Sequence, residues 1–152
     1  MSVRYNILLT TANAQTTNTA GKDYTWIYDF SRFQEGNYEV SFIFTSTNIA
    51  LASFATNGPI NLSMDIGVLS ETYLALPNNT NSKTQIIGTV PLLWSSTTIA
   101  TYKADTTDNV PVLFNSINRN TNFIRLSLLT LSSGLITTGL APWNVILSFK
   151  KV

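Results

Sequence analysis

The stretch DNVPVLFNSINRNTNFIRLSLLTL, residues 108–131, contains two strand-like runs on either side of a polar loop. The first run, residues 112–114, follows Pro111, which has no N–H to donate to a sheet and therefore belongs at a strand start or on a sheet edge. Residues 115–122 include four asparagines, whose side chains bond their own backbone and favour loops. The stretch therefore predicts a strand, a loop and a second strand.

The second run, residues 123–131, alternates between two faces, and we expect the face with Ile124, Leu126 and Leu128 to be buried. Similar alternation occurs at residues 3–10, 38–45, 60–68 and 144–151. Residues 24–30 carry aromatic residues at every second position, a less regular run lies at residues 84–93, and a short one lies at residues 98–104. Residues 47–54 fit either a strand or a helical turn. About eight or nine strands without an amphipathic helix indicate an all-β sandwich.

Two sets of apolar residues are candidates for the core. The first set lies on the inward faces of the predicted strands: Phe42, Phe44, Leu126, Leu128, Leu147 and Phe149. The second is a row of aromatic residues at a spacing of two: Tyr24, Trp26, Tyr28 and Phe30. Flat rings on a sheet face also suit sugar stacking, but sandwich interiors need bulky rows of this kind, so a core position is favoured.

The length of 152 residues fits one domain. Residues 1–23 are expected to form an N-terminal strand followed by a flexible arm, because residues 11–23 are rich in Thr, Ala and Asn and bury little. Residues 24–152 are expected to form the sandwich domain. Residues 77–83, PNNTNSK, predict an exposed loop.

The composition argues against most catalytic and nucleic-acid functions. Charged residues make up 11% of the chain, against about 25% in typical proteins, and the net charge is +1. No basic cluster points to nucleic acid. Histidine and cysteine are absent, which removes the commonest catalytic groups, so no enzymatic activity is expected. The first fifteen residues lack a signal-peptide core and no apolar run is long enough to span a membrane, so we expect no standard secretion.

Two further patterns in the sequence resemble sites. The oxygen-rich segment at residues 105–109, DTTDN, lacks the carboxylate spacing of a calcium loop, so no metal site is expected. The glycosylation pattern at Asn61 and Asn78 is interpreted as chance, because no secretory signal accompanies it. No cofactor motif is present either.

Three residues are predicted to lie near subunit contacts. Trp94 and Trp143 stand beside proline- or serine-rich turns and are expected to be exposed aromatic anchors. Arg119 lies in the predicted loop of the opening stretch. Lys150 and Lys151 are interpreted as a solvated chain end rather than a binding patch.

Five pieces of the chain carry a resemblance to a known family. They are FQEGNYEVSFIF from Phe33, MDIGV from Met64, TQIIGTV from Thr84, DNVPVLFNSINRNTNFIRLSLL from Asp108 and PWNVILSF from Pro142. In order and spacing they resemble the single jelly-roll minor capsid and penton (vertex) proteins of large icosahedral double-stranded DNA viruses. The fourth piece commonly begins Asp-Asn-Pro-Pro in that family, whereas this chain has Val110 at the third position.

The resemblance implies a single jelly-roll β-sandwich of about eight antiparallel strands that builds a virion shell. Its partners would be copies of itself, as in a pentamer, and other capsid proteins. Assembly would take place in the host cytoplasm. It transfers no catalytic residue and no cofactor. The alternative is a carbohydrate- or receptor-binding β-sandwich module, which would show a dissociable small-molecule site rather than assembly.

Overall fold

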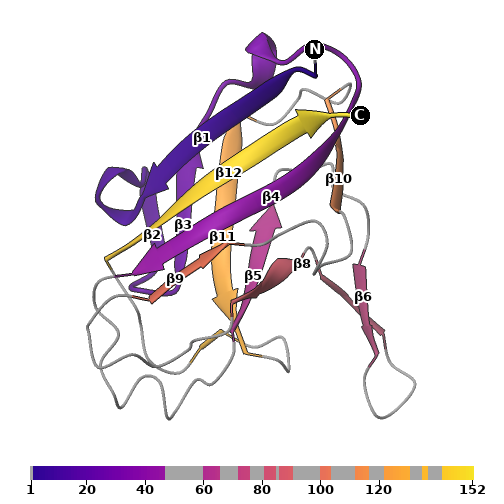
Figure 1. Ribbon diagram of the computed structural model, residues 1–152. Helices are drawn as coiled ribbons and strands as arrows, with labels where there is room; N and C mark the ends of the chain where they lie inside the picture. The colour runs from indigo at the N-terminus through magenta and orange to yellow at the C-terminus, as the bar shows by residue number, and fades with distance from the viewer. Residues whose placement is uncertain are drawn as a thin grey trace.

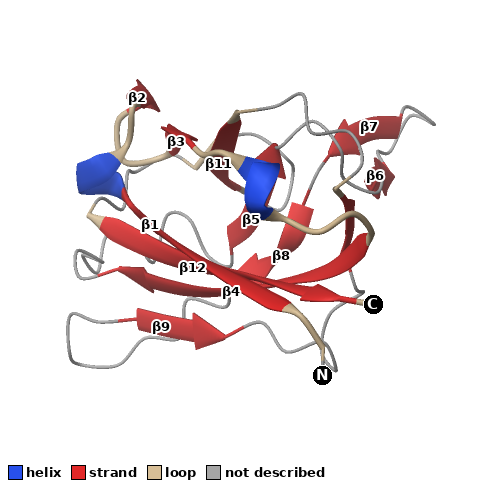
Figure 2. Cartoon of the chain, turned by 90° about the horizontal axis from the view of Figure 1, so that it is seen from above, coloured by secondary structure: helices blue, strands red, loops and turns tan. Residues whose placement is uncertain are grey.

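The computed structural model describes residues 2–46, 60–65, 72–75, 81–84, 86–90, 100–103, 112–116, 122–130, 135–136 and 142–152. Their strands form two large antiparallel sheets, which lie in separate layers (Figures 1 and 2). Sheet A has the order β1 (Arg4–Thr10), β12 (Trp143–Lys151), β4 (Asn37–Ser46) and β10 (Val112–Asn115), with β9 (Ala100–Lys103) also pairing with β4. Sheet B has the order β2 (Thr16–Thr19), β3 (Asp23–Ile27), β11 (Phe123–Leu129), β5 (Ile60–Asp65) and β8 (Ile86–Val90).

Three smaller elements complete the described part of the chain. A separate hairpin pairs β6 (Thr72–Ala75) with β7 (Asn81–Thr84). Two short 3-10 turns occupy Thr11–Asn13 and Phe30–Arg32. The second turn is capped by Asp29, whose carboxylate accepts the N–H of Ser31 at 2.8 Å.

Eight of the strands follow the path of a jelly roll. Counted along the chain as β1, β3, β4, β5, β8, β10, β11 and β12, the first pairs with the eighth, the second with the seventh, the third with the sixth and the fourth with the fifth. The pairings of β12 with β4 and of β11 with β5 join these pairs into the two sheets. The chain thus forms a long antiparallel ribbon wrapped into a sandwich, which confirms the expected fold class.

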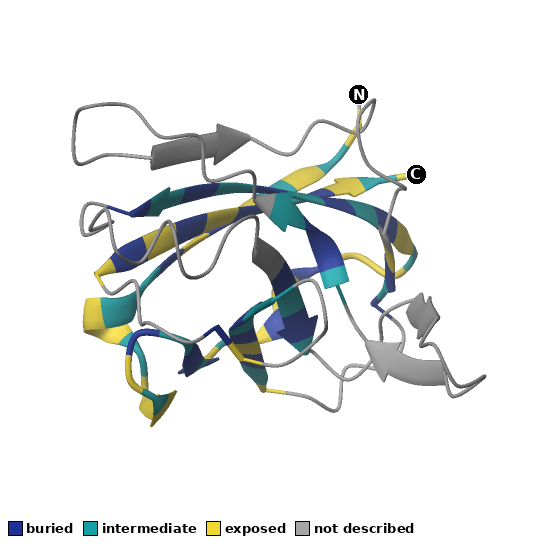
Figure 3. Ribbon diagram, turned by 90° about the horizontal axis from the view of Figure 1, so that it is seen from below, coloured by how far each residue is buried: buried dark blue, intermediate teal, exposed yellow. Residues whose placement is uncertain are grey.

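The core lies between the inward faces of the two sheets, where buried and exposed residues alternate along the strands (Figure 3). All six residues predicted for the inward strand faces are buried: Phe42, Phe44, Leu126, Leu128, Leu147 and Phe149. In the aromatic row, Tyr24, Trp26 and Phe30 are buried and Tyr28 packs partly buried against them. The core interpretation of that row is therefore confirmed.

The turn between residues 34 and 37, at the start of β4, is hydrogen-bonded to Ser116 at the end of β10. Gly36 donates its N–H to Oγ of Ser116 at 3.0 Å, and the N–H of Ser116 donates to the carbonyl of Gly36 at 3.0 Å. The hydroxyl of Ser116 lies 2.9 Å from the carbonyl of Gln34. Gly36 has a φ of 143°, a conformation that residues with a Cβ rarely adopt.

Two segments expected to be loops contain strands. Residues 11–23, predicted as an arm, hold a 3-10 turn and β2, which pairs with β3 and extends sheet B. Their threonines are β-branched and suit a strand, a preference that the polarity of the segment concealed. Residues 77–83, predicted as an exposed loop, include most of β7. Residues 47–54 and 66–68 lie outside the described residues.

Candidate functional site

Trp143, predicted to be an exposed contact residue, is buried, with 0% of its surface accessible. Its indole N–H donates to the carbonyl of Gly21 at 3.2 Å, and its ring contacts Tyr24 edge-on at a centroid distance of 5.4 Å. The expected exposure of Trp143 was wrong, because Trp143 is the first residue of β12 and shares the inward phase of Val145. Its neighbour Pro142 is exposed.

The other predicted contact residues, Trp94 and Arg119, lie outside the described residues, as do residues 105–109 and Asn78. Lys150 is exposed, whereas Lys151 is partly buried and donates from Nζ to Oε1 of Gln34 at 3.3 Å. Of the three predicted contact residues, the described part of the structure therefore contains only Trp143.

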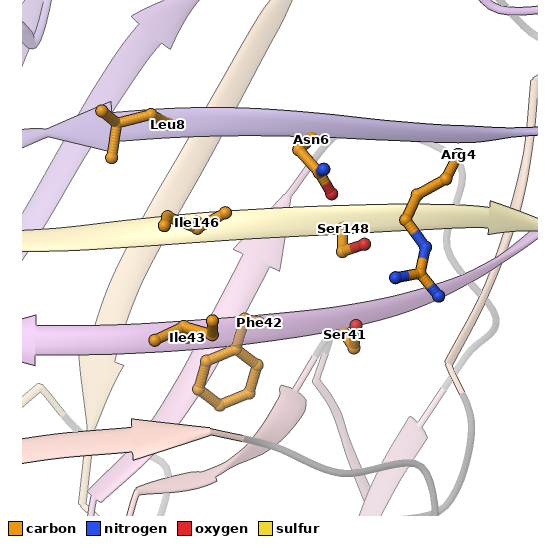
Figure 4. Close-up of a pocket in the computed structure, with 8 residues that line it drawn as sticks. All are labelled: Arg4, Asn6, Leu8, Ser41, Phe42, Ile43, Ile146 and Ser148. Carbon is orange, nitrogen blue, oxygen red and sulfur yellow. The ribbon is translucent and has the colours of Figure 1, made fainter.

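The outward face of sheet A carries an open groove of about 460 Å³ that the sequence interpretation did not identify. It is lined by Arg4, Asn6, Leu8, Ser41, Ile43, Ile146 and Ser148, together with Phe42, which is itself buried. Figure 4 shows that these residues come from three neighbouring strands, β1, β12 and β4. The alternation in each strand indicated which residues face outward, but only the strand pairing shows which of them become neighbours.

The strand pairing arranges the outward side chains in three parallel rows across β1, β12 and β4. The apolar row is Leu8, Ile146 and Ile43. The polar row is Asn6, Ser148 and Ser41. The charged row is Arg4, Lys150 and Glu39. Leu8, with 63% of its surface accessible, is the member of the apolar row nearest the sheet edge. The face can therefore offer apolar contact, hydrogen bonding and charge side by side.

On sheet B, a buried carboxylate is held by a half-exposed arginine. Asp23 has 2% of its surface accessible and accepts from Nε of Arg125 at 3.0 Å, from Nη2 of the same side chain, and from Nδ2 of Asn18 at 3.1 Å. Burial alone raises the pKa of Asp23, but the bonds from Arg125 and Asn18 outweigh burial, so the pKa lies below its ordinary value. Because the carboxylate is already satisfied, this pair fits a structural role.

No protein-family model matches the chain, and no curated protein sequence matches it. Within the described segments, no helix has the length and apolar character needed to cross a bilayer. In the same segments, no three acidic side chains lie close enough together to hold a metal ion.

Proposed function

We propose that this chain is a structural subunit of the capsid of a large icosahedral DNA virus, in the position of a penton or another minor capsid protein. It would act by assembly with copies of itself and with other shell proteins, without enzymatic turnover. Its place would be the virion, after assembly in the host cytoplasm.

The proposal is carried by the five sequence pieces that resemble this class of protein. In the folded chain, the pieces starting at Phe33, Met64, Thr84, Asp108 and Pro142 contain residues of β4, β5, β8, β10 together with β11, and β12, respectively. These are six of the eight strands of the jelly roll. The resemblance thus runs through both sheets in chain order.

Two physical features support assembly. Jelly rolls are the architecture of many viral capsid domains, although they also serve lectins and cupins, so the fold alone does not decide the function. With only 11% charged residues, the chain presents surfaces that a neighbour can cover without removing many ions from water. The capsid proposal therefore rests on a fold that permits this function, on a surface with few charges and on the resemblance of the five pieces.

Native mass spectrometry of the purified full chain tests the proposal. We expect a closed homo-oligomer, with a pentamer as the favoured species, because cyclic symmetry closes without leaving an open edge. The variants Arg119→Glu and Trp94→Ala should shift the distribution towards monomer. Arg32→Glu, on the exposed face of the second 3-10 turn, is the matched control and should leave the oligomer intact.

The alternative module would behave differently in the same preparation. A chain that stays monomeric at every concentration and binds a defined glycan on an array would replace the capsid proposal with a carbohydrate-binding function.

A further inference from the structure

Among the strands that the structure describes, β1 forms an edge of sheet A and pairs only with β12 (Figure 1). The N–H of Lys151 donates to the carbonyl of Val3 at 2.9 Å, which sets the phase of the ladder. In an antiparallel pair, alternate residues bond the partner strand and the residues between them direct N–H and C=O away. The backbone groups directed away from β12 are therefore those of the residues that we call the β1 edge: Arg4, Asn6 and Leu8.

A contact at the end of the strand agrees with this phase. The carbonyl of Thr10, which follows in the same alternation, accepts the indole N–H of Trp26 at 2.8 Å. Across the described segments, no such bond occupies the backbone groups of the β1 edge. A row of open donors and acceptors is the usual template for an added strand.

The charged row shows what chemistry such a strand would need. Arg4 stands directly opposite Lys150, and like charges at opposed positions destabilise a sheet. Lys150 has Glu39 as its neighbour on the far side, in β4. The corresponding position on the far side of Arg4 is the one that an added strand would fill. An acidic residue there would balance the row.

We propose that the β1 edge binds an extended segment of another protein as an additional antiparallel strand of sheet A. In the N-to-C direction the segment carries an apolar residue beside Leu8, an uncharged polar residue beside Asn6 and an acidic residue beside Arg4, each separated by one residue. It extends the apolar, polar and charged rows by one strand. This interaction is independent of the proposed capsid role.

A second copy of β1 is the poorer occupant. The strand, RYNILLT, contains no acidic residue to place beside Arg4. Antiparallel pairing of two such strands centred on Asn6 would set Leu8 beside Arg4 twice, so that the apolar and charged rows would both be interrupted. The charges therefore favour a different chain.

A synthetic peptide, Thr-Leu-Thr-Asn-Thr-Glu-Thr, tests the proposal against the full-length protein by fluorescence anisotropy. We expect saturable binding, with slowed amide exchange at Asn6 and Leu8. N-methylation of the peptide at Leu, Asn and Glu, whose N–H groups would face β1, should weaken binding at least about tenfold. N-methylation at the intervening threonines is the matched control and should weaken peptide binding much less.

A charge exchange tests the register. The peptide with Lys in place of Glu should bind the natural protein more weakly but bind the Arg4→Glu variant better than the original peptide does. The proposal is overturned by the absence of saturable binding up to about 1 mM, by equal effects of the two N-methylation patterns, or by insensitivity to the charge exchange. Protection of the edge amides in the protein alone would also overturn it, because a second copy would then be the occupant.

Discussion

Asp23 on β3 and Arg125 on β11, 102 positions apart in the sequence, form a bidentate ion pair on sheet B. The pair is diagonal, because the residue opposite Asp23 is Ser127. Asp23 is buried, whereas the side chain of Arg125 is 47% accessible. Water can therefore solvate the guanidinium if the pair is broken, but it cannot reach the carboxylate. The contact joins the second and seventh strands of the jelly roll.

Replacing Arg125 should therefore destabilise the protein. Arg125→Gln leaves a buried carboxylate without its charged donor, and we expect a loss of about 1.5–3 kcal/mol in the free energy of unfolding, the usual value for a hydrogen-bonded charge. Urea unfolding at neutral pH measures it. Arg32→Gln, at an exposed position, is the control and should cost less than about 0.5 kcal/mol. Equal losses in the two variants would show that the ion pair contributes little.

The same pair should make stability depend on pH in the acid range. Since the pKa of Asp23 is lowered in the folded protein from its ordinary 3.8, its contribution is fully present above that value and is lost as pH falls through the folded pKa. As the pH falls below 3.8, the natural protein should lose more stability than Asp23→Asn does. Thermal unfolding from neutral to acid pH checks this. Parallel pH profiles for the two proteins would contradict it.

The face assignment of β4 can be tested with neighbouring residues. Phe42 has 1% of its surface accessible and lies in the core, whereas Ile43 lies on the outward face in the apolar row. Phe42→Ala should cost about 3–5 kcal/mol, the usual loss for a buried aromatic residue. Ile43→Ala, measured by the same urea unfolding, should cost clearly less. A cost under about 1 kcal/mol for Phe42→Ala would place that ring at the surface.

A substitution at Gly36 would introduce two costs, backbone strain and crowding against Lys151, and a double variant can separate them. Its φ of 143° disfavours any Cβ, and a Cβ built there would lie 2.8 Å from Cε of Lys151. The lysine end is flexible, so we expect the backbone to dominate and Gly36→Ala to cost about 1–3 kcal/mol. Adding Lys151→Ala should recover little of this loss. Full recovery in the double variant, measured by thermal unfolding, would assign the cost to crowding instead.

The sequence predicted the fold well where period-two alternation was long. Along residues 38–44 of β4, 124–128 of β11 and 143–149 of β12, every second residue is apolar and buried, and the pattern alone indicates both the strand and its inward face. It failed for β2 and β7, whose residues are mostly Thr, Asn and Ser, because a short edge strand needs no apolar face. Their pairing is decided by backbone bonds to a neighbour, which composition does not record.

The candidate site was less predictable for a related reason. The outward positions of Arg4 and Leu8 follow from alternation, but their neighbours Lys150 and Ile146 lie about 140 residues away and are set by the register of β1 with β12. For Trp143, by contrast, the sequence held the information but it was not used. A tryptophan beside a proline was interpreted as a surface anchor, although the alternation that starts at Trp143 already indicated an inward position.

The burial of Trp143 makes a last prediction that separates packing from hydrogen bonding. The indole N–H of Trp143 donates to the carbonyl of Gly21. The backbone N–H of Gly21 in turn donates to the hydroxyl of Tyr24 at 2.7 Å. Trp143→Phe keeps an aromatic ring but leaves that carbonyl unpaired in the core, and should cost about 1–3 kcal/mol. Trp143→Ala should cost about 3–5 kcal/mol, because it also leaves a cavity beside Tyr24. Urea unfolding measures both losses. The burial and its hydrogen bond would be contradicted if both variants kept the stability of the natural protein, as they would for a tryptophan exposed at a subunit contact.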